Sequence, residues 1–206
     1  MKDCDIRVLS LADLPKAPDV VEDGLTFRAN ALKKAVEMAL WASKMKMEDV
    51  DNTLSRLSPP FVAVPHQKRS VLLVMGEDSG LEVDALQGRP GVHSARYSGE
   101  GATDAKNNTK LLAELADVPL ERRTARYRSA IALADRSGIL EIVEDSCEGL
   151  IAIEPRGTNG FGYDPLFYIP QHQKTFGELP LAVKQTMSHR AKALREILRV
   201  LPKYLI

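Results

Sequence analysis

The chain has few cysteines, no long apolar run and no excess of charge of either sign. Its two thiols, Cys4 and Cys147, are too few for a disulfide framework or a thiolate metal cluster. Two isolated cysteines are typical of a reducing compartment, so we expect a cytoplasmic protein. No apolar stretch approaches the ~18 residues that a membrane-spanning helix needs. Residues 1–11 also lack the apolar core of a signal peptide.

The balance of charge limits the class of partner. The sequence holds 28 Lys and Arg residues and 28 Asp and Glu residues, so its net charge is zero at pH 7. Zero net charge gives no general attraction to nucleic acid or to anionic membranes, and we expect neither as a partner. Any nucleotide therefore has to be bound by a local site.

The length and the apolar patterns predict a single α/β domain over residues 1–206. A chain of 206 residues, 44% of them hydrophobic, can bury one substantial core. Strands and helices alternate early and strands cluster later, which favours an elongated mixed sheet with flanking helices, folded as two lobes around a central cleft. Residues 46–70 carry little pattern and three prolines, and we interpret them as an inserted loop. Helices are predicted at 26–47, 103–115 and 188–201, and strands at 6–11, 71–75, 125–134, 139–145, 148–153 and 166–169.

An acidic tetrapeptide follows a continuous apolar run. Val71–Met75 has the pattern of a strand buried on both faces, and Glu77, Asp78, Ser79 and Gly80 come just after it. Carboxylates at the end of such a strand suit Mg²⁺, which binds one or two of them together with substrate phosphates. Taken alone, the tetrapeptide fits a solvated acidic turn better than a metal site, because short motifs often occur by chance.

A glycine-rich loop is the second candidate. The segment 157–165 has three glycines within six positions, which leave backbone N–H groups free to bind a ligand. Phe161 and Tyr163 offer ring faces for stacking on a nucleotide base, an interaction of ~1–3 kcal/mol per base. The alternative is a plain glycine-rich hairpin, and the two rings argue against it because exposed rings in a loop usually contact something.

The start of the last predicted helix is the third candidate. Free N–H groups and the helix dipole at Ser188, His189 and Arg190 favour a ligand that carries oxygen atoms, and Lys184 precedes them. The alternative reduces Ser188 to a helix cap and Arg190 to a surface cation.

A fourth group surrounds the start of the first predicted helix. Glu22 could supply a second metal carboxylate, and Lys34 could reach a phosphate from the helical face that it shares with Asn30. The alternative is that acidic residues stand before the helix because they interact favourably with its dipole.

Together these segments resemble the inosine/xanthosine triphosphate pyrophosphatase family, whose members hydrolyse non-standard purine nucleoside triphosphates. The resemblance covers most of residues 5–45 and 75–201. Its motifs are the segments 78–86 and 88–97, the run Phe161-Gly162-Tyr163-Asp164-Pro165, the tripeptide Ser188-His189-Arg190, and Gly24-Leu25-Thr26-Phe27 with Asn30-Ala31.

The resemblance implies a fold and a reaction. The fold is an elongated α/β protein with a long mixed sheet and two lobes flanking a cleft, usually a homodimer. In the reaction, water attacks the α-phosphorus of dITP, ITP or XTP and releases pyrophosphate and the monophosphate. The reaction requires Mg²⁺ and cleanses the nucleotide pool.

The resemblance also assigns residues to this site. It implies Asp78 as general base, Glu22 and Asp78 as Mg²⁺ ligands, and Lys34 as a phosphate contact. These roles suit the chemistry, because hydrolysis at phosphorus depends mainly on charge neutralisation and positioning. Donors that face O6 of the base would also reject adenine. The substrate-binding residues that the resemblance implies are Ser79, Phe161, Gly162, Tyr163, Asp164, Lys184, His189 and Arg190.

One departure from the family bears on phosphate binding. The family begins with a strand and a Thr/Ser-x-Asn-x-x-Lys loop that grips the triphosphate, and no such loop precedes Ile6 or follows near a strand end. A second hypothesis is therefore a catalytically impaired nucleotide-binding or scaffold protein of the same fold, and a third is a Mg²⁺ phosphohydrolase for another nucleotide. The presence of Asp78, Lys184, His189 and Arg190 favours the enzyme.

Overall fold

A computed structural model describes residues 6, 8–14, 17–45 and 71–205. They form a five-stranded sheet in which strands that follow one another in sequence are neighbours in space, in the order β1-β2-β3-β4-β5. The α/β class with flanking helices is confirmed. Every pairing in the described sheet is antiparallel, whereas the sequence predicted a mixed sheet. The strands are β1 (Val74–Val83), β2 (Thr124–Asp135), β3 (Gly138–Ile151), β4 (Phe167–Ile169) and β5 (Lys174–Thr175).

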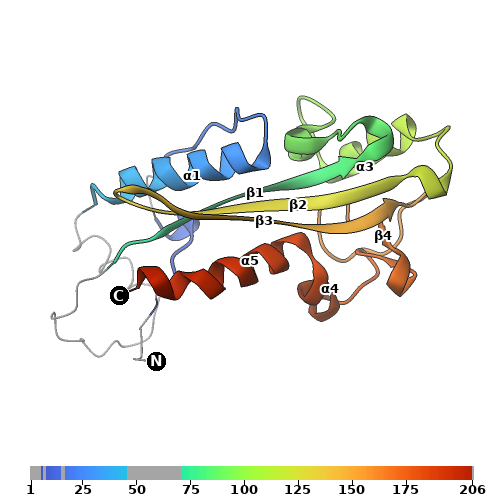
Figure 1. Cartoon of the computed structure of the whole chain (residues 1–206). Coiled ribbons are helices and arrows are strands. Elements are labelled where there is room, and N and C mark those ends of the chain that lie inside the picture. Colours follow the sequence, from blue (N-terminus) through green and yellow to red (C-terminus); the bar gives the residue numbers. More distant parts are fainter. Residues whose placement is uncertain (1–5, 7, 15–16, 46–70, 206) are drawn as a thin grey trace.

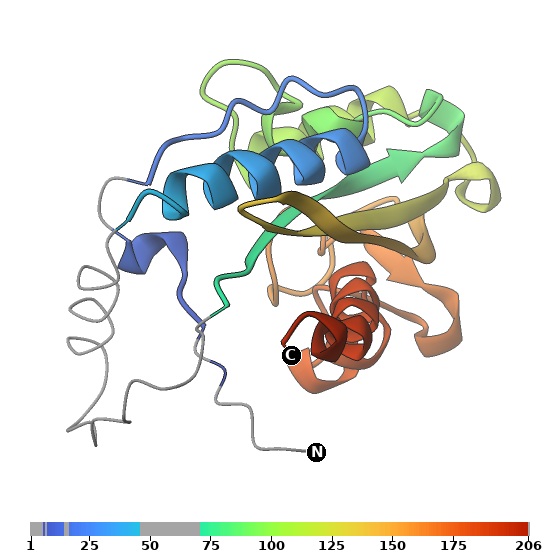
Figure 2. The same ribbon diagram turned by 60° about the vertical axis from the view of Figure 1, so that its left-hand side comes forward.

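Helices cover both faces of the sheet, as Figures 1 and 2 show. On one face lies α1 (Phe27–Ala42), and on the other lie α4 (Leu181–Met187) and α5 (His189–Val200). α3 (Asp104–Glu114) contributes Leu111 to the core beside Leu81 of β1. None of the helices in the described part of the chain has the length and apolarity that crossing a bilayer requires.

Small side chains let α1 lie close to β1. Ala31 and Ala35 of α1 are fully buried, and Gly76 of β1 faces them without a side chain. A Cβ at Gly76 would come within 2.5 Å of the Ala31 carbonyl oxygen and the Ala35 nitrogen, so this approach requires glycine. The close contact brings the polar side of the same helix over the middle of β1.

β1 differs most from its predicted form. We predicted a strand at 71–75 that ends before the acidic tetrapeptide at 77–80, but β1 continues through the tetrapeptide to Val83. The strand continues because Leu81 and Val83 alternate into the core, a period that the polar residues between them conceal. The tetrapeptide is therefore part of the sheet and not a turn at its edge.

This correction places consecutive residues of the tetrapeptide on opposite faces of the sheet. Asp78 pairs with Ala130 of β2 and points toward α1, where it meets Asn30. Glu77 and Ser79 point to the other face, where both meet α5. Successive side chains of a strand alternate in this way because the backbone is pleated.

The remaining predictions fared unevenly. The helices at 103–115 and 188–201 are confirmed as α3 and α5, and the hydroxyls of Thr103 and Ser188 cap their first turns. The strands predicted at 139–145 and 148–153 are a single strand, β3. The strand predicted at 6–11 is wrong, since residues 6 and 8–10 are in no strand and a short 3₁₀ helix begins at Leu11. The predicted insertion at 46–70 lies outside the described residues.

Candidate functional site

The first half of the site surrounds Asp78 on the α1 face. Asp78 is only 7% exposed, and its Oδ2 accepts a hydrogen bond from Asn30 Nδ2 at 2.9 Å. Lys34 Nζ lies 3.2 Å from Asp78 Oδ1 and 2.8 Å from Glu22 Oε1. One ammonium group therefore brings two carboxylates from distant parts of the chain to the same place.

Asn30 organises this half of the site, a role that the sequence did not reveal. It is almost fully buried, and its Oδ1 accepts a hydrogen bond from Gly24 N at 2.8 Å while its Nδ2 holds Asp78. A Cβ at Gly24 would come within 2.5 Å of Asn30 Oδ1, so glycine lets the preceding loop close onto α1. That loop carries Glu22, whose carbonyl oxygen also accepts from Arg96 Nη2 at 3.2 Å.

The electrostatics around Asp78 leave room for a further cation. Burial raises the pKa of Asp78 above its ordinary value, and the hydrogen bonds and charge from Asn30 and Lys34 offset this only in part. The nearby charge of Glu22 adds to the rise. Two carboxylates with one shared ammonium fit a hard cation such as Mg²⁺, provided that substrate or water supplies the other ligands. The part of the chain that the structure describes contains no group of three or more His, Cys, Asp and Glu side chains that could hold a metal without such help.

The second half of the site begins on the opposite face of the same strand. Arg190 Nε donates to Glu77 Oε1 at 2.9 Å, and Arg190 Nη2 donates to Glu77 Oε2 at 3.3 Å and to Ser79 Oγ at 3.0 Å. Burial acts to raise the pKa of Glu77, but the Arg190 guanidinium, together with hydrogen bonds from Ser79 and Ser129, outweighs it and the pKa is lowered overall. Glu77 is thus an anion that fixes one side of the Arg190 guanidinium.

The glycine-rich loop forms around a buried carboxylate. Asp164 is 2% exposed and accepts hydrogen bonds from Phe161 N at 2.9 Å and from Lys184 Nζ. Gly160 has a positive φ of 82°, and a Cβ there would overlap the Asp164 carboxylate. The loop is therefore closed onto Asp164 rather than open. Gly162 fixes its far end, where its N–H donates to Asp104 Oδ2 at 2.6 Å.

The two aromatic residues of this loop have different environments. Phe161 is 57% exposed, so its ring is available to a ligand. Tyr163 is 3% exposed, and its hydroxyl donates to the carbonyl oxygen of Ser94 at 2.7 Å. The sequence predicted two rings for stacking, but the ring of Tyr163 is packed in the core and only that of Phe161 is accessible.

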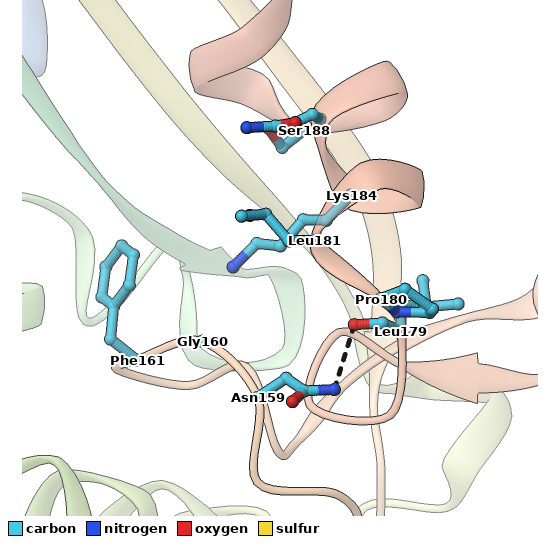
Figure 3. A pocket seen from close by; sticks show the side chains of 9 residues that line it. Asn159, Gly160, Phe161, Leu179, Pro180, Leu181, Lys184 and Ser188 are labelled. Carbon is cyan, nitrogen blue, oxygen red and sulfur yellow. Dashed lines mark hydrogen bonds between the residues drawn. The ribbon is translucent and has the colours of Figure 1, made fainter.

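A cavity of about 340 Å³ opens beside Phe161 (Figure 3). Lys184 Nζ lies 5.1 Å and Arg190 Cζ 5.1 Å from the centroid of the Phe161 ring, so two cations stand near one exposed aromatic face. Figure 3 shows Lys184 extending toward Phe161 from the opposite side of the cavity. The residues that line it are Asn159, Gly160, Phe161, Leu179, Pro180, Leu181, Lys184, Gln185 and Ser188.

His189 is held by a buried tyrosine that the sequence analysis missed. Its ring stacks on Tyr127 of β2, with centroids 4.7 Å apart and planes 13° from parallel. The Tyr127 hydroxyl donates to Asp164 and accepts from the Tyr163 N–H, and burial with the Asp164 charge raises its pKa well above the ordinary value. The available signal was a tyrosine between Arg126 and Arg128 in a predicted strand, at a position that alternates with the two charged residues. Tyr127 links the glycine-rich loop to α5.

His189 is neutral at physiological pH. Burial, helped by the positive charge of Arg190, lowers the pKa of His189 from 6.5 to about 3. Its Nδ1 is buried and has no hydrogen-bond partner in the part of the chain that the structure describes. A neutral imidazole carries one N–H donor and one acceptor, so His189 can offer a ligand either type of contact.

The lowered pKa predicts that acid destabilises the fold through His189. The unfolded chain binds a proton at His189 more readily than the folded chain, so stability present above pH 6.5 is lost as the pH falls toward about 3. The expected loss from this residue at pH 4.5 is roughly 2–3 kcal/mol. In urea unfolding at pH 7 and pH 4.5, the variant His189→Gln should lose less stability than wild type by that amount. The matched variant at the exposed His172, His172→Gln, should behave as wild type, and equal acid sensitivity of His189→Gln and wild type would contradict the prediction.

The chain matches known proteins over most of its own length and most of theirs. It matches the family model described as the Ham1 family over residues 1–200. It is 41% identical over 206 residues to a dITP/XTP pyrophosphatase of Desulforamulus reducens, covering 100% of this chain and 89% of the relative. It is 47% identical over 191 residues to a dITP/XTP pyrophosphatase of Rhodopirellula baltica, covering 92% of this chain and 78% of the relative.

Solved structures give the same picture of the fold. The Ham1 protein of Staphylococcus aureus superposes with a TM-score of 0.76 at 32% identity, covering 96% of this chain and 87% of that one. A HAM1 protein from Coxiella burnetii superposes with a TM-score of 0.72 at 37% identity, covering 90% of this chain and 81% of that one.

Proposed function

The chain belongs to the Ham1 family, and on that basis we propose that it hydrolyses dITP, ITP and XTP to the monophosphate and pyrophosphate, and so removes non-standard purines from the nucleotide pool. It is a hydrolase that acts on acid anhydrides. The observation that carries the proposal is that consecutive residues of β1 contact two different groups of side chains, on opposite faces of the sheet. Asp78 faces a cluster suited to phosphate and metal. Ser79, the next residue, contacts Arg190, which stands over the ring of Phe161 in the wall of a cavity suited to a base.

The phosphate half would carry the chemistry. Asp78 would take a proton from the attacking water, because it lies beside Lys34 and Glu22 where the phosphates would bind. Lys34 contacts a phosphate oxygen and neutralises part of its charge. Glu22 and Asp78 would hold Mg²⁺, which when bound neutralises the triphosphate and orients it.

The base half would select the substrate. Phe161 stacks on the purine, and Lys184, His189 and Arg190 supply N–H groups around it. A 6-oxo purine presents an acceptor at O6, whereas adenine presents a 6-amino donor that would leave these N–H groups unpaired. A cavity of about 340 Å³ is within the size range of small-molecule sites.

We also propose a homodimer in the cytoplasm without a nucleic-acid or membrane partner. The proposed homodimer rests on the resemblance of the sequence motifs to a family whose members are usually dimeric. The zero net charge supports the absence of polyanionic partners. A cytoplasmic location is where nucleoside triphosphates are made and used.

A substrate panel tests the proposed function. We expect dITP, ITP and XTP to be hydrolysed with kcat/KM at least ~100-fold above that of ATP, because the unpaired donors penalise adenine. The measurement is pyrophosphate release, with and without a chelator. Chelation should abolish the reaction and added Mg²⁺ should restore it. Binding of ITP without any turnover would instead favour a nucleotide-binding or scaffold role.

A further inference from the structure

Given that proposed function, we propose that Glu77 is the positioning residue for base selectivity: its carboxylate holds Arg190 as a reader of the base and prevents it from acting as a phosphate-binding cation. Glu77 touches neither the cavity wall nor the Asp78 cluster with its side chain. It would therefore act through Arg190 alone.

The contact between the two side chains is of the kind that fixes orientation. Two N–H groups of the guanidinium, on Nε and Nη2, donate to the two oxygens of Glu77 at 2.9 and 3.3 Å. Such bidentate pairs are stronger than neutral hydrogen bonds and allow one geometry. Nη2 is further engaged by Ser79 Oγ at 3.0 Å. Nη1 has no partner among the described residues, so its two N–H groups are the ones left for a ligand.

The carboxylate of Glu77 is itself held in place. Ser129 Oγ, on the neighbouring strand β2, donates to Glu77 Oε1 at 3.1 Å. Asp78 points to the other face of the sheet, so the two adjacent acids serve different neighbours. Only the backbone carbonyl of Glu77 reaches the phosphate half, where Lys34 Nζ donates to it at 3.0 Å.

The charges around Phe161 explain what this positioning achieves. Two cations flank the ring, and each is matched by one carboxylate: Asp164 accepts from Lys184, and Glu77 accepts from Arg190. Paired in this way, the cations add little net charge to the cavity, which suits an uncharged base. Without Glu77, the Arg190 guanidinium would carry an uncompensated charge and turn toward phosphate, the usual ligand of a free arginine fork.

The variant Glu77→Gln tests the inference, since it keeps the size of the side chain and removes its charge. We expect KM for dITP to rise ~10–100-fold with kcat within about threefold of wild type, because a charged hydrogen-bond pair is lost but the Asp78 half is intact. The ratio of kcat/KM for dITP over ATP should fall at least ~10-fold. Glu82→Gln is the matched control: Glu82 lies on the same strand, faces the other way and pairs with Arg126 and Arg128 at 3.9 and 3.8 Å. Glu82→Gln should leave KM for dITP and KM for ATP unchanged.

A double-mutant cycle shows whether Glu77 acts through Arg190. If it does, Glu77→Gln combined with Arg190→Ala should have the selectivity of Arg190→Ala alone. Glu77→Asp, which keeps the charge, should lose less selectivity than Glu77→Gln, and thermal melts identify any variant that fails to fold. Additive effects in the cycle, or a fall in kcat at unchanged KM, would overturn the inference. A wild type without preference for dITP over ATP refutes the proposed function and this inference together, whereas a selective wild type with an unchanged Glu77→Gln variant refutes the inference alone.

Discussion

The variant Asp78→Asn is expected to release pyrophosphate ~1,000-fold more slowly than wild type, or not at all, while remaining folded. The substitution removes the group that takes the proton from water. It also removes one of the two carboxylates proposed to hold Mg²⁺, and Glu22 alone cannot replace it. The measurement is pyrophosphate release from dITP at saturating Mg²⁺, together with a thermal melt.

The melt is expected to show no loss of stability in this variant. Burial raises the pKa of Asp78, so its ionised form costs folding free energy at every pH above that raised value. The cost disappears as the pH falls below the pKa of the unfolded chain, so the melts are compared well above that pH. Asparagine is neutral and its carbonyl oxygen can still accept from Asn30 Nδ2. The melting temperature of Asp78→Asn should therefore equal or exceed that of wild type.

Asp84→Asn is the matched control for this loss of activity. Asp84 follows directly after β1 and is paired, with Arg126 Nη1 at 3.0 Å and with Thr124 Oγ1 at 2.6 Å, but it lies outside both halves of the site. It should keep wild-type turnover. Near-normal turnover of Asp78→Asn, or an equal loss in both variants, would remove Asp78 from the chemistry.

The variant Gly160→Ala is expected to lose base binding and stability together. An added Cβ would overlap the Asp164 carboxylate and come within 3.1 Å of Lys184 Nζ, and Asp164 is too buried to move aside. The backbone there has φ of 82°, a conformation that alanine adopts at a cost of ~1–2 kcal/mol. With the overlap included, we expect a loss of roughly 2–5 kcal/mol in the free energy of unfolding. KM for dITP should rise at least ~10-fold as the loop bearing Phe161 is displaced.

Gly99→Ala separates the two causes. Gly99 has a similar φ of 90°, but a Cβ there would meet nothing within 4 Å. This variant should lose only the ~1–2 kcal/mol of the backbone conformation and keep the wild-type KM. If urea unfolding gives the same loss for both variants, contact with Asp164 is not what requires glycine at position 160.

Local signals predicted the helices better than the strands. The side chains of Thr26, Thr103 and Ser188 each accept a hydrogen bond from the backbone N–H three residues later. Threonine and serine are common at this position before a helix. The bounds of β1 were predicted wrongly, because the apolar residues at 71–73 suggested a strand although they precede the first paired residue, Val74. The extended run through Glu77 and Asp78 depends on pairing with β2, which is a tertiary effect.

The candidate site could be predicted as a set of residues but not as an arrangement. Asp78, Lys34 and Glu22 lie in contact, as a site for phosphate and metal requires. The binding of phosphate and metal by these residues stays a prediction. The sequence could not show that Arg190 is committed to Glu77, or that His189 rests on Tyr127, because these partners are 113 and 62 positions apart in the chain. Tyr163 was misread for the same reason, since its ring is buried in a core built from distant segments and its hydroxyl donates to the Ser94 carbonyl oxygen, 69 positions away.

The alternation of side chains along β1 has a consequence for how the enzyme can change. A substitution at one position of this 10-residue strand reaches one face only, so substrate preference and hydrolytic rate can be altered separately by mutation. A shift of the β1–β2 register by one residue would do the opposite, since it would exchange every side chain between the faces and put Glu77 where Asp78 belongs. New substrate preferences are therefore accessible through point mutations, whereas an insertion or deletion within the strand disrupts base selection and hydrolysis together.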